Sequence, residues 1–192
     1  MKLPDRYLIT PEPANFVDLN QFKQHLSELI QAGIRLIYLR SKQLDTVAYN
    51  RLAKLIAYEC QLHSVQLILR ANHSSDIWPL AHGIHLTSKE LIHYQKRSLP
   101  NGFLLLASCH NLEQLQLAKN IGVNAITLSP VLPTNSHPDA VTLGWDKFVE
   151  LAETVPMPIF ALGGMQTQHL PIAKAHGAYG IAAISHFWQS IS

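Results

Sequence analysis

The sequence predicts an α/β protein, a compact (β/α)8 barrel of the TIM type formed by residues 1–192 as one domain. Short apolar segments alternate along the chain with segments of helical periodicity, as in parallel sheets covered by helices. Eight such apolar segments can be counted, and eight β/α units close into a barrel. Hydrophobic residues make up 47% of the chain, which is enough to bury a continuous core.

The first half of the chain contains four expected strands. Residues 6–10 (RYLIT) are rich in β-branched and aromatic side chains and end before Pro11, which is typical of a strand entering a loop. Apolar residues then recur at helical spacing over 19–32, where Asp18 supplies an N-cap and Gly33 follows the last turn. The remaining expected elements are strands at 34–39, 65–69 and 83–86 and a helix at 46–62.

The second half continues the alternation. We expect strands at 103–107, 124–128, 158–162 and 178–184, and helices at 112–121 and 166–176. The longest irregular segment is 129–144, and loops of this length often cover or bind ligands. The competing fold is an open doubly wound sheet, which usually has a glycine-rich first turn. Here the first turn, 10–13, reads TPEP, which favours the barrel.

Composition excludes several classes of partner. The formal net charge is +2 without a dense basic run, which argues against binding to nucleic acid. No segment approaches the roughly 18 apolar residues of a membrane span, and the first residues lack the apolar stretch of a signal peptide. Cys60 and Cys109 form no CxxC motif, as expected in a reducing compartment. We therefore expect a cytoplasmic protein that binds a small molecule.

Residues that follow the strands of a barrel converge on one rim, whatever their separation in sequence. The expected rim is rich in cations, imidazoles and hydroxyls, namely Arg40, Lys42, Arg70, Asn72, His85, Thr87, Ser108, His110, Thr134, Ser136, His137 and Ser185. In the first half the nearby carboxylates are Asp76 and Glu90. Such a rim suits an anion better than it suits a metal by itself.

A second indication of an anion comes from small residues at the last two strand ends. Gly163 and Gly164 follow the seventh expected strand, and Ile184 and Ser185 follow the eighth. A phosphate site in a barrel needs backbone N–H groups that approach the phosphate oxygens closely. A plain flexible turn is the alternative, but the position of the glycine pair favours binding of a phosphorylated ligand.

The individual rim residues differ in how they are interpreted. Arg40 and Lys42 lie two positions apart, so extended chain would direct both side chains to one face, which favours anion binding. Arg70 is either a ligand of the anion or the partner of Asp76. His85 lies within an apolar strand, which favours a hydrogen-bonded core residue over an acid or base.

Motifs spread over residues 7–185 show a resemblance to a known family. In chain order they are YLIT, YLRSK, GIHL, ASCHN, SPVLPTNSH, ALGGM and GAYGIAAIS. Together they resemble thiamine-phosphate synthase and its relative, the thiazole tautomerase. ASCHN and SPVLPTNSHP look like the branch that is also found fused behind a Nudix hydrolase domain.

The resemblance implies the barrel fold and the condensation of hydroxymethylpyrimidine pyrophosphate with thiazole phosphate, in thiamine biosynthesis or salvage. It places pyrophosphate at Arg40 and Lys42. The catalytic candidates are Arg40, Lys42, Arg70, Ser108 and His137. The candidates for binding substrate or its phosphate are Tyr38, Asn72, His85, Thr134, Ser136, Gly163, Gly164, Ile184 and Ser185.

The sequence departs from the family pattern where the family binds Mg²⁺. The family carries an Asn-Asp pair after the third strand, and Arg70 and Ala71 stand there instead. The second family Asp aligns with Glu90, which is left as a weak metal candidate. His137 replaces a lysine and Tyr38 a glutamine. We therefore expect weak Mg²⁺ binding, with Arg70 as a counter-charge for an oxyanion.

Two further functions remain open. A metal-independent thiazole tautomerase would need a general acid and base, for which His137 or His85 is the candidate. A non-catalytic sensor of a phosphorylated ligand, or a partner of a separate Nudix hydrolase, would keep the pocket without the chemistry. The oligomeric state, including a homo-oligomer, is also open.

Overall fold

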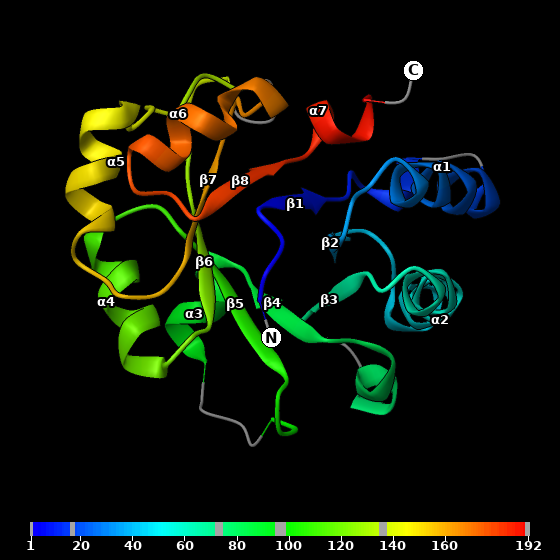
Figure 1. Ribbon diagram of the computed structural model, residues 1–192. Helices are drawn as coiled ribbons and strands as arrows, with labels where there is room; N and C mark the ends of the chain where they lie inside the picture. The colour runs from blue at the N-terminus through cyan, green and yellow to red at the C-terminus, as the bar shows by residue number, and fades with distance from the viewer. Residues whose placement is uncertain (1, 16–17, 72–74, 95–98, 135–137, 191–192) are drawn as a thin grey trace.

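The computed structural model describes residues 2–15, 18–71, 75–94, 99–134 and 138–190. Eight parallel strands pair in sequence order, and β8 pairs with β1, so the sheet closes into a barrel. The helices surround this ring of strands (Figure 1). The predicted (β/α)8 barrel is confirmed.

The strands are short and occupy the apolar segments of the sequence. They are β1 (Arg6–Ile9), β2 (Leu36–Leu39), β3 (Gln66–Arg70), β4 (Gly83–Leu86), β5 (Leu104–Cys109), β6 (Ala125–Leu128), β7 (Ile159–Leu162) and β8 (Gly180–Ala183). The α-helices are α1 (Leu19–Gln31), α2 (Thr46–Leu62), α3 (Ser88–His93), α4 (Leu112–Ile121), α5 (Gly144–Ala152), α6 (Leu170–Ala175) and α7 (Ser185–Trp188). Short 3-10 helices are η1 (Pro13–Asn15), η2 (Ser75–Leu80) and η3 (Thr167–His169).

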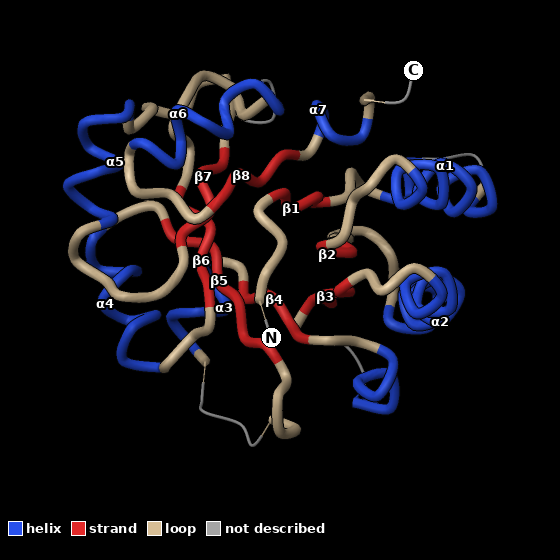
Figure 2. Tube along the Cα trace, in the orientation of Figure 1, coloured by secondary structure: helices blue, strands red, loops and turns tan. Residues whose placement is uncertain are grey.

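Alternating side chains of the strands build two apolar layers. One layer lies between the strands and the outer helices, which form the periphery in Figure 2. The other fills the barrel interior with Tyr7, Tyr38, Ile68, Leu106 and Phe160 among its members. Strands buried on both faces must be apolar at almost every position, which explains why they were recognisable as continuous apolar runs.

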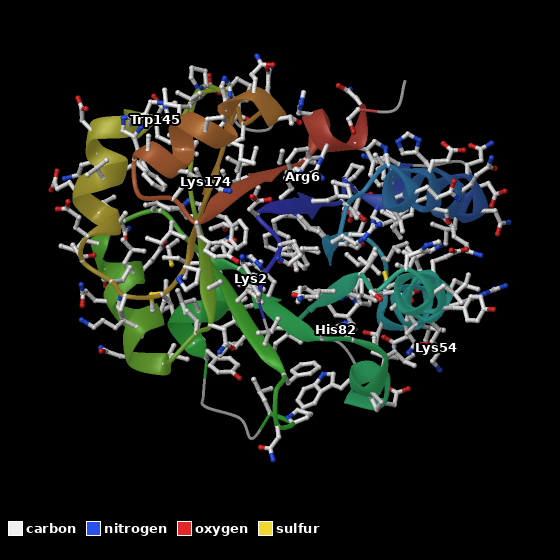
Figure 3. The ribbon with its side chains drawn as sticks, in the orientation of Figure 1. Lys2, Arg6, Lys54, His82, Trp145 and Lys174 are labelled. Carbon is white, nitrogen blue, oxygen red and sulfur yellow. The ribbon has the colours of Figure 1, made fainter. Side chains whose placement is uncertain are left out.

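The first residues of the chain fill the N-terminal mouth of the barrel. Leu3 is buried within the interior cluster, and its carbonyl accepts a hydrogen bond from the Tyr179 hydroxyl. The Lys2 carbonyl accepts from the side-chain amide of Gln66 at 3.1 Å. Figure 3 shows Lys2 near the middle of the ring of strands. The opposite end, where the strands terminate, is therefore the end that a ligand can enter.

Three α-helices, α3, α5 and α7, were not expected from the sequence. Thr87 and Glu90 form a capping box at the start of α3, so two end groups of this short helix are satisfied. Helix α5 begins at Gly144, where the expected irregular segment ends, and buries Phe148 and Leu151. The expected helix at 166–176 is divided into η3 and α6. Within the described ranges, no helix is both long and apolar enough to cross a membrane.

Candidate functional site

The candidate residues lie where the parallel strands end. Arg40 directly follows β2, Arg70 is the last residue of β3, Ser108 lies near the end of β5, and Gly163 follows β7. Because all eight strands run parallel, these positions face the same end of the barrel. The rim predicted from the sequence is thus the C-terminal rim of the barrel.

A chain of hydrogen bonds crosses the barrel interior and ends near this rim. The Tyr7 hydroxyl lies 3.0 Å from His85 Nδ1, and His85 Nε2 lies 2.8 Å from Ser108 Oγ. The Thr127 hydroxyl donates to the same Ser108 oxygen at 3.3 Å. Tyr7, His85 and Thr127 are fully buried, whereas Ser108 is half-buried. The chain therefore connects the closed interior to a hydroxyl that a ligand can reach.

Burial makes His85 a neutral hydrogen-bonding residue. Desolvation lowers its pKa to about 3, so the imidazole carries no charge near neutral pH. The ring of Tyr38 stacks on it with centroids 4.5 Å apart and planes inclined by 14°. A group with such a low pKa is a poor proton acceptor near pH 7. This geometry favours the core interpretation of His85 over the acid–base interpretation.

A buried carboxylate holds the loop that carries Arg40 and Lys42. Glu12, in the loop after β1, is 8% exposed. Its carboxylate accepts from the Ser41 hydroxyl and from the backbone N–H of Lys42, both at 2.6 Å. Thr10 also exchanges hydrogen bonds with the backbone of Arg40 at 3.0 and 3.3 Å. The residues after β1 therefore fix the backbone from which both cations project.

Arg70 holds the same loop from the other side. One guanidinium nitrogen donates to the carbonyls of Ser41 at 3.4 Å and Leu44 at 2.9 Å. The guanidinium carbon lies 4.1 Å from the centre of the Tyr49 ring, a cation–π contact. Through these contacts, Arg70 stabilises the conformation of the loop after β2. Its action as a counter-charge for a bound anion stays a prediction.

Charged groups of the rim affect the pKa of the Tyr38 hydroxyl. Burial raises the pKa of its hydroxyl far above the ordinary value. The charge of Glu90 raises it further, while the charges of Arg40 and Arg70 lower it. The phenol therefore stays protonated, and these three charged groups lie close enough to act on it. Tyr38 thus stacks on His85 and precedes Arg40, the first residue of the cationic loop, by two positions.

The glycine pair lets two loops approach each other. Gly163 has φ +96°, and a Cβ there would lie 2.8 Å from the Cα of Pro130. Gly164 has φ +66°, and a Cβ there would lie 2.5 Å from the carbonyl oxygen of Pro133. The N–H of Leu132 donates to the Gly163 carbonyl at 3.2 Å. The loop after β6, which carries half-buried Thr134, is thereby held against the end of β7.

Ile184 and Ser185 lie where β8 passes into α7. Ile184 occupies the N-cap position of this helix, and Ser185 is its first residue. Ile184 is half-buried against the barrel interior, and Ser185 is exposed. The backbone of this junction therefore faces the rim next to the glycine pair, because β7 and β8 are neighbours.

The carboxylate proposed for metal binding is engaged elsewhere. One oxygen of Glu90 accepts from both the N–H and the hydroxyl of Thr87 at 2.8 Å, which caps α3. Ala71 offers no ligand at the position after β3. Among the residues that the structure describes, no group of three or more His, Cys, Asp and Glu side chains could hold a metal. The donor set of this rim therefore does not fit an Mg²⁺ site formed by protein ligands alone.

Several candidates lie outside the described residues or outside the site. Asn72, Ser136 and His137 belong to segments that the structure does not describe. His110 is exposed and its Nδ1 lies 2.9 Å from the Ser129 carbonyl. Cys109 is buried, and desolvation raises the pKa of its thiol to about 12, so it is not a thiolate nucleophile near neutral pH.

Sequence reasoning missed three residues of this arrangement, namely Tyr7, Glu12 and Thr127. Each had a visible signal. Tyr7 and Thr127 are polar-tipped residues within otherwise apolar strands, and Glu12 is a carboxylate in a proline-rich turn after a strand. Buried polar groups of this kind need hydrogen-bond partners, which their positions alone did not identify.

Comparison with known proteins agrees with the geometry. The family model for thiamine monophosphate synthase matches residues 6–187. A protein of Aquifex aeolicus, provisionally named thiamine-phosphate synthase 2, is 32% identical over 98% of this chain and 100% of its own length. The thiamine-phosphate synthase of Coprothermobacter proteolyticus is 30% identical over 85% of this chain and 78% of its own length.

A solved structure is similar in fold. The thiamine phosphate pyrophosphorylase from Pyrococcus furiosus superposes with a TM-score of 0.73 and 20% identity, covering 94% of this chain and 85% of that chain. The family model spans the strands from β1 to β8, including the rim residues that the structure brings together. The chain therefore belongs to the thiamine monophosphate synthase family.

Proposed function

We propose that the protein forms thiamine phosphate from hydroxymethylpyrimidine pyrophosphate and thiazole phosphate. The observation that carries this proposal is the cationic loop after β2, which Glu12 and Arg70 hold at the same rim of the barrel as the Ser108 end of the interior hydrogen-bond chain. Family membership implies a role in thiamine biosynthesis. The arrangement supplies positive charge for the pyrophosphate and a polar floor for the pyrimidine of the same substrate.

The cationic loop would stabilise the leaving group. In this reaction the bond between the pyrimidine methylene carbon and the pyrophosphate oxygen breaks, and the electron pair stays on pyrophosphate. Arg40 and Lys42 would meet the developing negative charge, and fixed cations lower the barrier because they need no reorganisation. The hydrogen bond from the Lys42 backbone to Glu12 supports this role, since it fixes the loop before substrate arrives.

The backbone around the glycine pair would hold the thiazole phosphate. Gly163 is buried and Gly164 half-buried against the loop after β6, whereas Ser185 at the start of α7 is exposed. Among the loop and turn hydrogen bonds of the described residues, none uses the N–H of Gly163 or Gly164 as donor. Such groups suit phosphate oxygens. Thr134 lies in the adjacent loop and would add a hydroxyl.

The barrel interior would orient the pyrimidine and keep water away. Tyr38 and His85 form a stacked pair below the rim, and Ser108 is the accessible polar end of the chain. The thiazole nitrogen would attack the pyrimidine methylene cation above this floor. The closed N-terminal mouth supports the exclusion of water, which protects a reactive cation from hydrolysis.

The proposal routes no step through a metal, because the described residues of the rim do not form an Mg²⁺ site from protein ligands alone. The weak Mg²⁺ site at Glu90 and the location of the protein in the cytoplasm stay predictions. The same holds for a homo-oligomer, a Nudix hydrolase partner and the assignment of residues 1–192 to one domain.

The test is an assay of both substrates, with thiamine phosphate and pyrophosphate measured as products, in Mg²⁺ and in EDTA. Arg40→Gln should lower kcat/KM about 100-fold, as expected for the loss of one fixed charge-stabilising donor. Arg51→Gln, at an exposed position of α2, is the matched control and should leave kcat/KM unchanged.

Each alternative function gives its own result in this assay. Isomerisation of the thiazole carboxylate phosphate in EDTA, without any thiamine phosphate, would assign the tautomerase reaction instead. Thermal stabilisation by thiazole phosphate without turnover of either kind would indicate a ligand sensor. Both results contradict the synthase proposal.

A further inference from the structure

In the interior hydrogen-bond chain, the burial of Tyr7 and Thr127 determines which group donates and which accepts at each step. A buried hydroxyl hydrogen without an acceptor costs free energy, whereas one that faces a ligand or solvent does not. Tyr7 and Thr127 are fully buried and Ser108 is half-buried. The two buried hydroxyls must therefore place their hydrogens within the chain.

The Tyr7 end fixes the tautomer of His85. His85 Nδ1, at 3.0 Å, is the partner of the Tyr7 hydroxyl among the described residues. Burial raises the pKa of Tyr7 well above its ordinary value, so the phenol keeps its proton. If that proton is donated, Nδ1 is the acceptor and the imidazole hydrogen lies on Nε2. Nε2–H then donates to Ser108 Oγ at 2.8 Å.

The Thr127 end adds a second donor to the same oxygen. Its hydroxyl donates to Ser108 Oγ at 3.3 Å. A hydroxyl oxygen has two lone pairs and one hydrogen. His85 and Thr127 therefore fill both acceptor positions of Ser108.

We propose that Ser108 is a donor-only hydroxyl and that Tyr7 is the positioning residue that makes it so, acting through the Nε2–H tautomer of His85. The hydrogen of Ser108 then points toward the open end of the barrel. The substrate atom that lies against Ser108 must be a hydrogen-bond acceptor, such as an unprotonated ring nitrogen or a phosphate oxygen. A substrate presenting an N–H at this point would meet a donor and be rejected.

This inference rests on the proposed function for the identity of the substrate but not for the tautomer itself. The first experiment therefore needs no substrate. Nuclear magnetic resonance of the full chain with ¹⁵N-labelled imidazoles distinguishes protonated from unprotonated ring nitrogens, and the His85→Gln spectrum identifies the His85 signals among the eleven histidines. We expect Nε2 protonated and Nδ1 unprotonated, unchanged between about pH 5 and about pH 8. A hydrogen on Nδ1 would overturn the proposal, whether or not the protein shows synthase activity.

The second experiment is a double-mutant cycle in the synthase assay. Tyr7→Phe removes the donor to His85 and should lower kcat about tenfold with little change in KM. In a Ser108→Ala background the same substitution should change kcat less than about twofold, because residues that act through one another are not additive. Equal losses in the two backgrounds would show that Tyr7 matters only for the stability of the fold, and the proposal would fail.

Three further variants accompany this cycle. Thr127→Ser keeps the second donor and should retain activity, whereas Thr127→Val should lose about as much as Tyr7→Phe. Tyr179→Phe removes a phenolic hydroxyl at the opposite end of the barrel, where it donates to the Leu3 carbonyl. This control should leave both kcat and the imidazole spectrum unchanged. A change of the His85 signals in Tyr179→Phe would count against a specific action of Tyr7.

Discussion

The rim formed by β1 to β4 and the rim formed by β5 to β8 present different kinds of groups. The first presents charged side chains, Arg40 and Lys42, on a loop that Glu12 and Arg70 hold. The second presents glycine backbone at Gly163 and Gly164, packed closely against the loop after β6. The first half therefore depends on electrostatics and hydrogen bonds, and the second depends on shape.

This difference determines whether a substitution in each half of the rim lowers binding and catalysis or lowers stability. A charged side chain can be replaced by a neutral one of similar size without disturbing its neighbours' packing, so the loss appears mainly in binding or catalysis. A glycine at positive φ beside another backbone has no room for any side chain, so the loss appears in stability as well. The two halves meet at His85 on β4 and Ser108 on β5.

The largest effect is expected in the second half, for Gly164→Ala. The new Cβ would lie 2.5 Å from the Pro133 carbonyl oxygen at φ +66°, so the loop after β6 would have to move. We expect the free energy of unfolding to fall by about 3 kcal/mol, as for strain combined with overpacking. Thiazole phosphate should bind more weakly, while pyrimidine pyrophosphate should bind as before.

Gly122→Ala is the control for this prediction. Gly122 has φ +81°, but a Cβ there would meet no atom within 4 Å. This variant should lose about 1 kcal/mol from backbone strain alone. Denaturant unfolding of both variants measures the difference, and equal losses would show that close approach of the two loops is not what requires Gly164.

The second effect concerns His85, which lies where the two halves meet, and is measured as the pH dependence of the free energy of unfolding. Burial holds the pKa of folded His85 at about 3, against 6.5 for the free side chain. Below pH 6.5 the unfolded chain therefore binds a proton that the folded chain does not, and stability is lost as pH falls toward 3. The slope should approach about 1.4 kcal/mol per pH unit, giving a loss of about 2 kcal/mol by about pH 5.

Unfolding of His85→Gln across the same pH range is the control. This variant lacks the titrating group, so its stability should fall less steeply with acidification. Half-buried His82, whose pKa burial also lowers, should leave a smaller residual slope in both proteins. Identical pH profiles for the two proteins would mean that His85 does not stay neutral in the folded state.

The third effect concerns the first half and the variant Glu12→Gln. The amide keeps the size of the side chain but removes the charge that accepts from Ser41 and Lys42 at 2.6 Å. Charge-assisted hydrogen bonds stabilise a loop more than neutral ones do. If the substitution costs about 1.4 kcal/mol of the free energy that holds the loop in its binding conformation, substrate affinity falls by a factor of about ten. The KM for pyrimidine pyrophosphate should rise about tenfold, with the KM for thiazole phosphate unchanged.

The matched control is Glu150→Gln, which removes an exposed carboxylate paired with Lys147 on α5. An exposed pair contributes little, so steady-state kinetics of this variant should match the parent protein. If Glu12→Gln raised the KM of both substrates alike, the two halves of the rim would not be separate binding regions.

The same contrast explains what the sequence could predict. Strands such as β2 and β3 were recognisable because burial on both faces requires an apolar residue at nearly every position. The cations Arg40 and Lys42 were recognisable because a barrel brings all strand ends to one rim. The capping box at Thr87 and Glu90 was not predicted, although a Thr followed three residues later by a Glu is a signal of a helix start, and it explains both α3 and the engagement of Glu90.

The partners of buried polar groups could not be predicted in this way. Tyr7 and His85 are 78 residues apart and meet across the barrel interior, so their contact depends on the register of strands that are not neighbours. Arg70 likewise contacts carbonyls 26 and 29 residues away. Sequence reasoning identified Arg70 as a rim residue, but its engagement with the loop after β2 required the folded chain.

The smallest effect is expected for Ala71→Asp, which tests whether the rim formed by β1 to β4 can bind Mg²⁺. The substitution restores a carboxylate directly after β3. Arg70 should be kept, because its contacts with Ser41 and Leu44 hold the cationic loop and Arg70→Asn would release it. The new carboxylate would directly follow β3, whereas Glu90 lies in the first turn of α3, and the charges of Arg70 and Glu90 both affect the pKa of Tyr38. Because Arg70 adds repulsion and Glu90 already caps α3, we expect Mg²⁺ to raise the turnover of Ala71→Asp only about twofold to fivefold. This range corresponds to the free energy of about 0.5–1 kcal/mol that a partly solvated charge pair contributes.

The control is Ala71→Asn, which has the same size as Ala71→Asp without the charge and should show no gain of turnover in Mg²⁺. Calorimetric titration of both variants with Mg²⁺ measures metal binding independently of activity. A strong Mg²⁺ requirement in the parent protein, equal to that of Ala71→Asp, would show that the rim already holds the metal through groups other than a carboxylate at position 71.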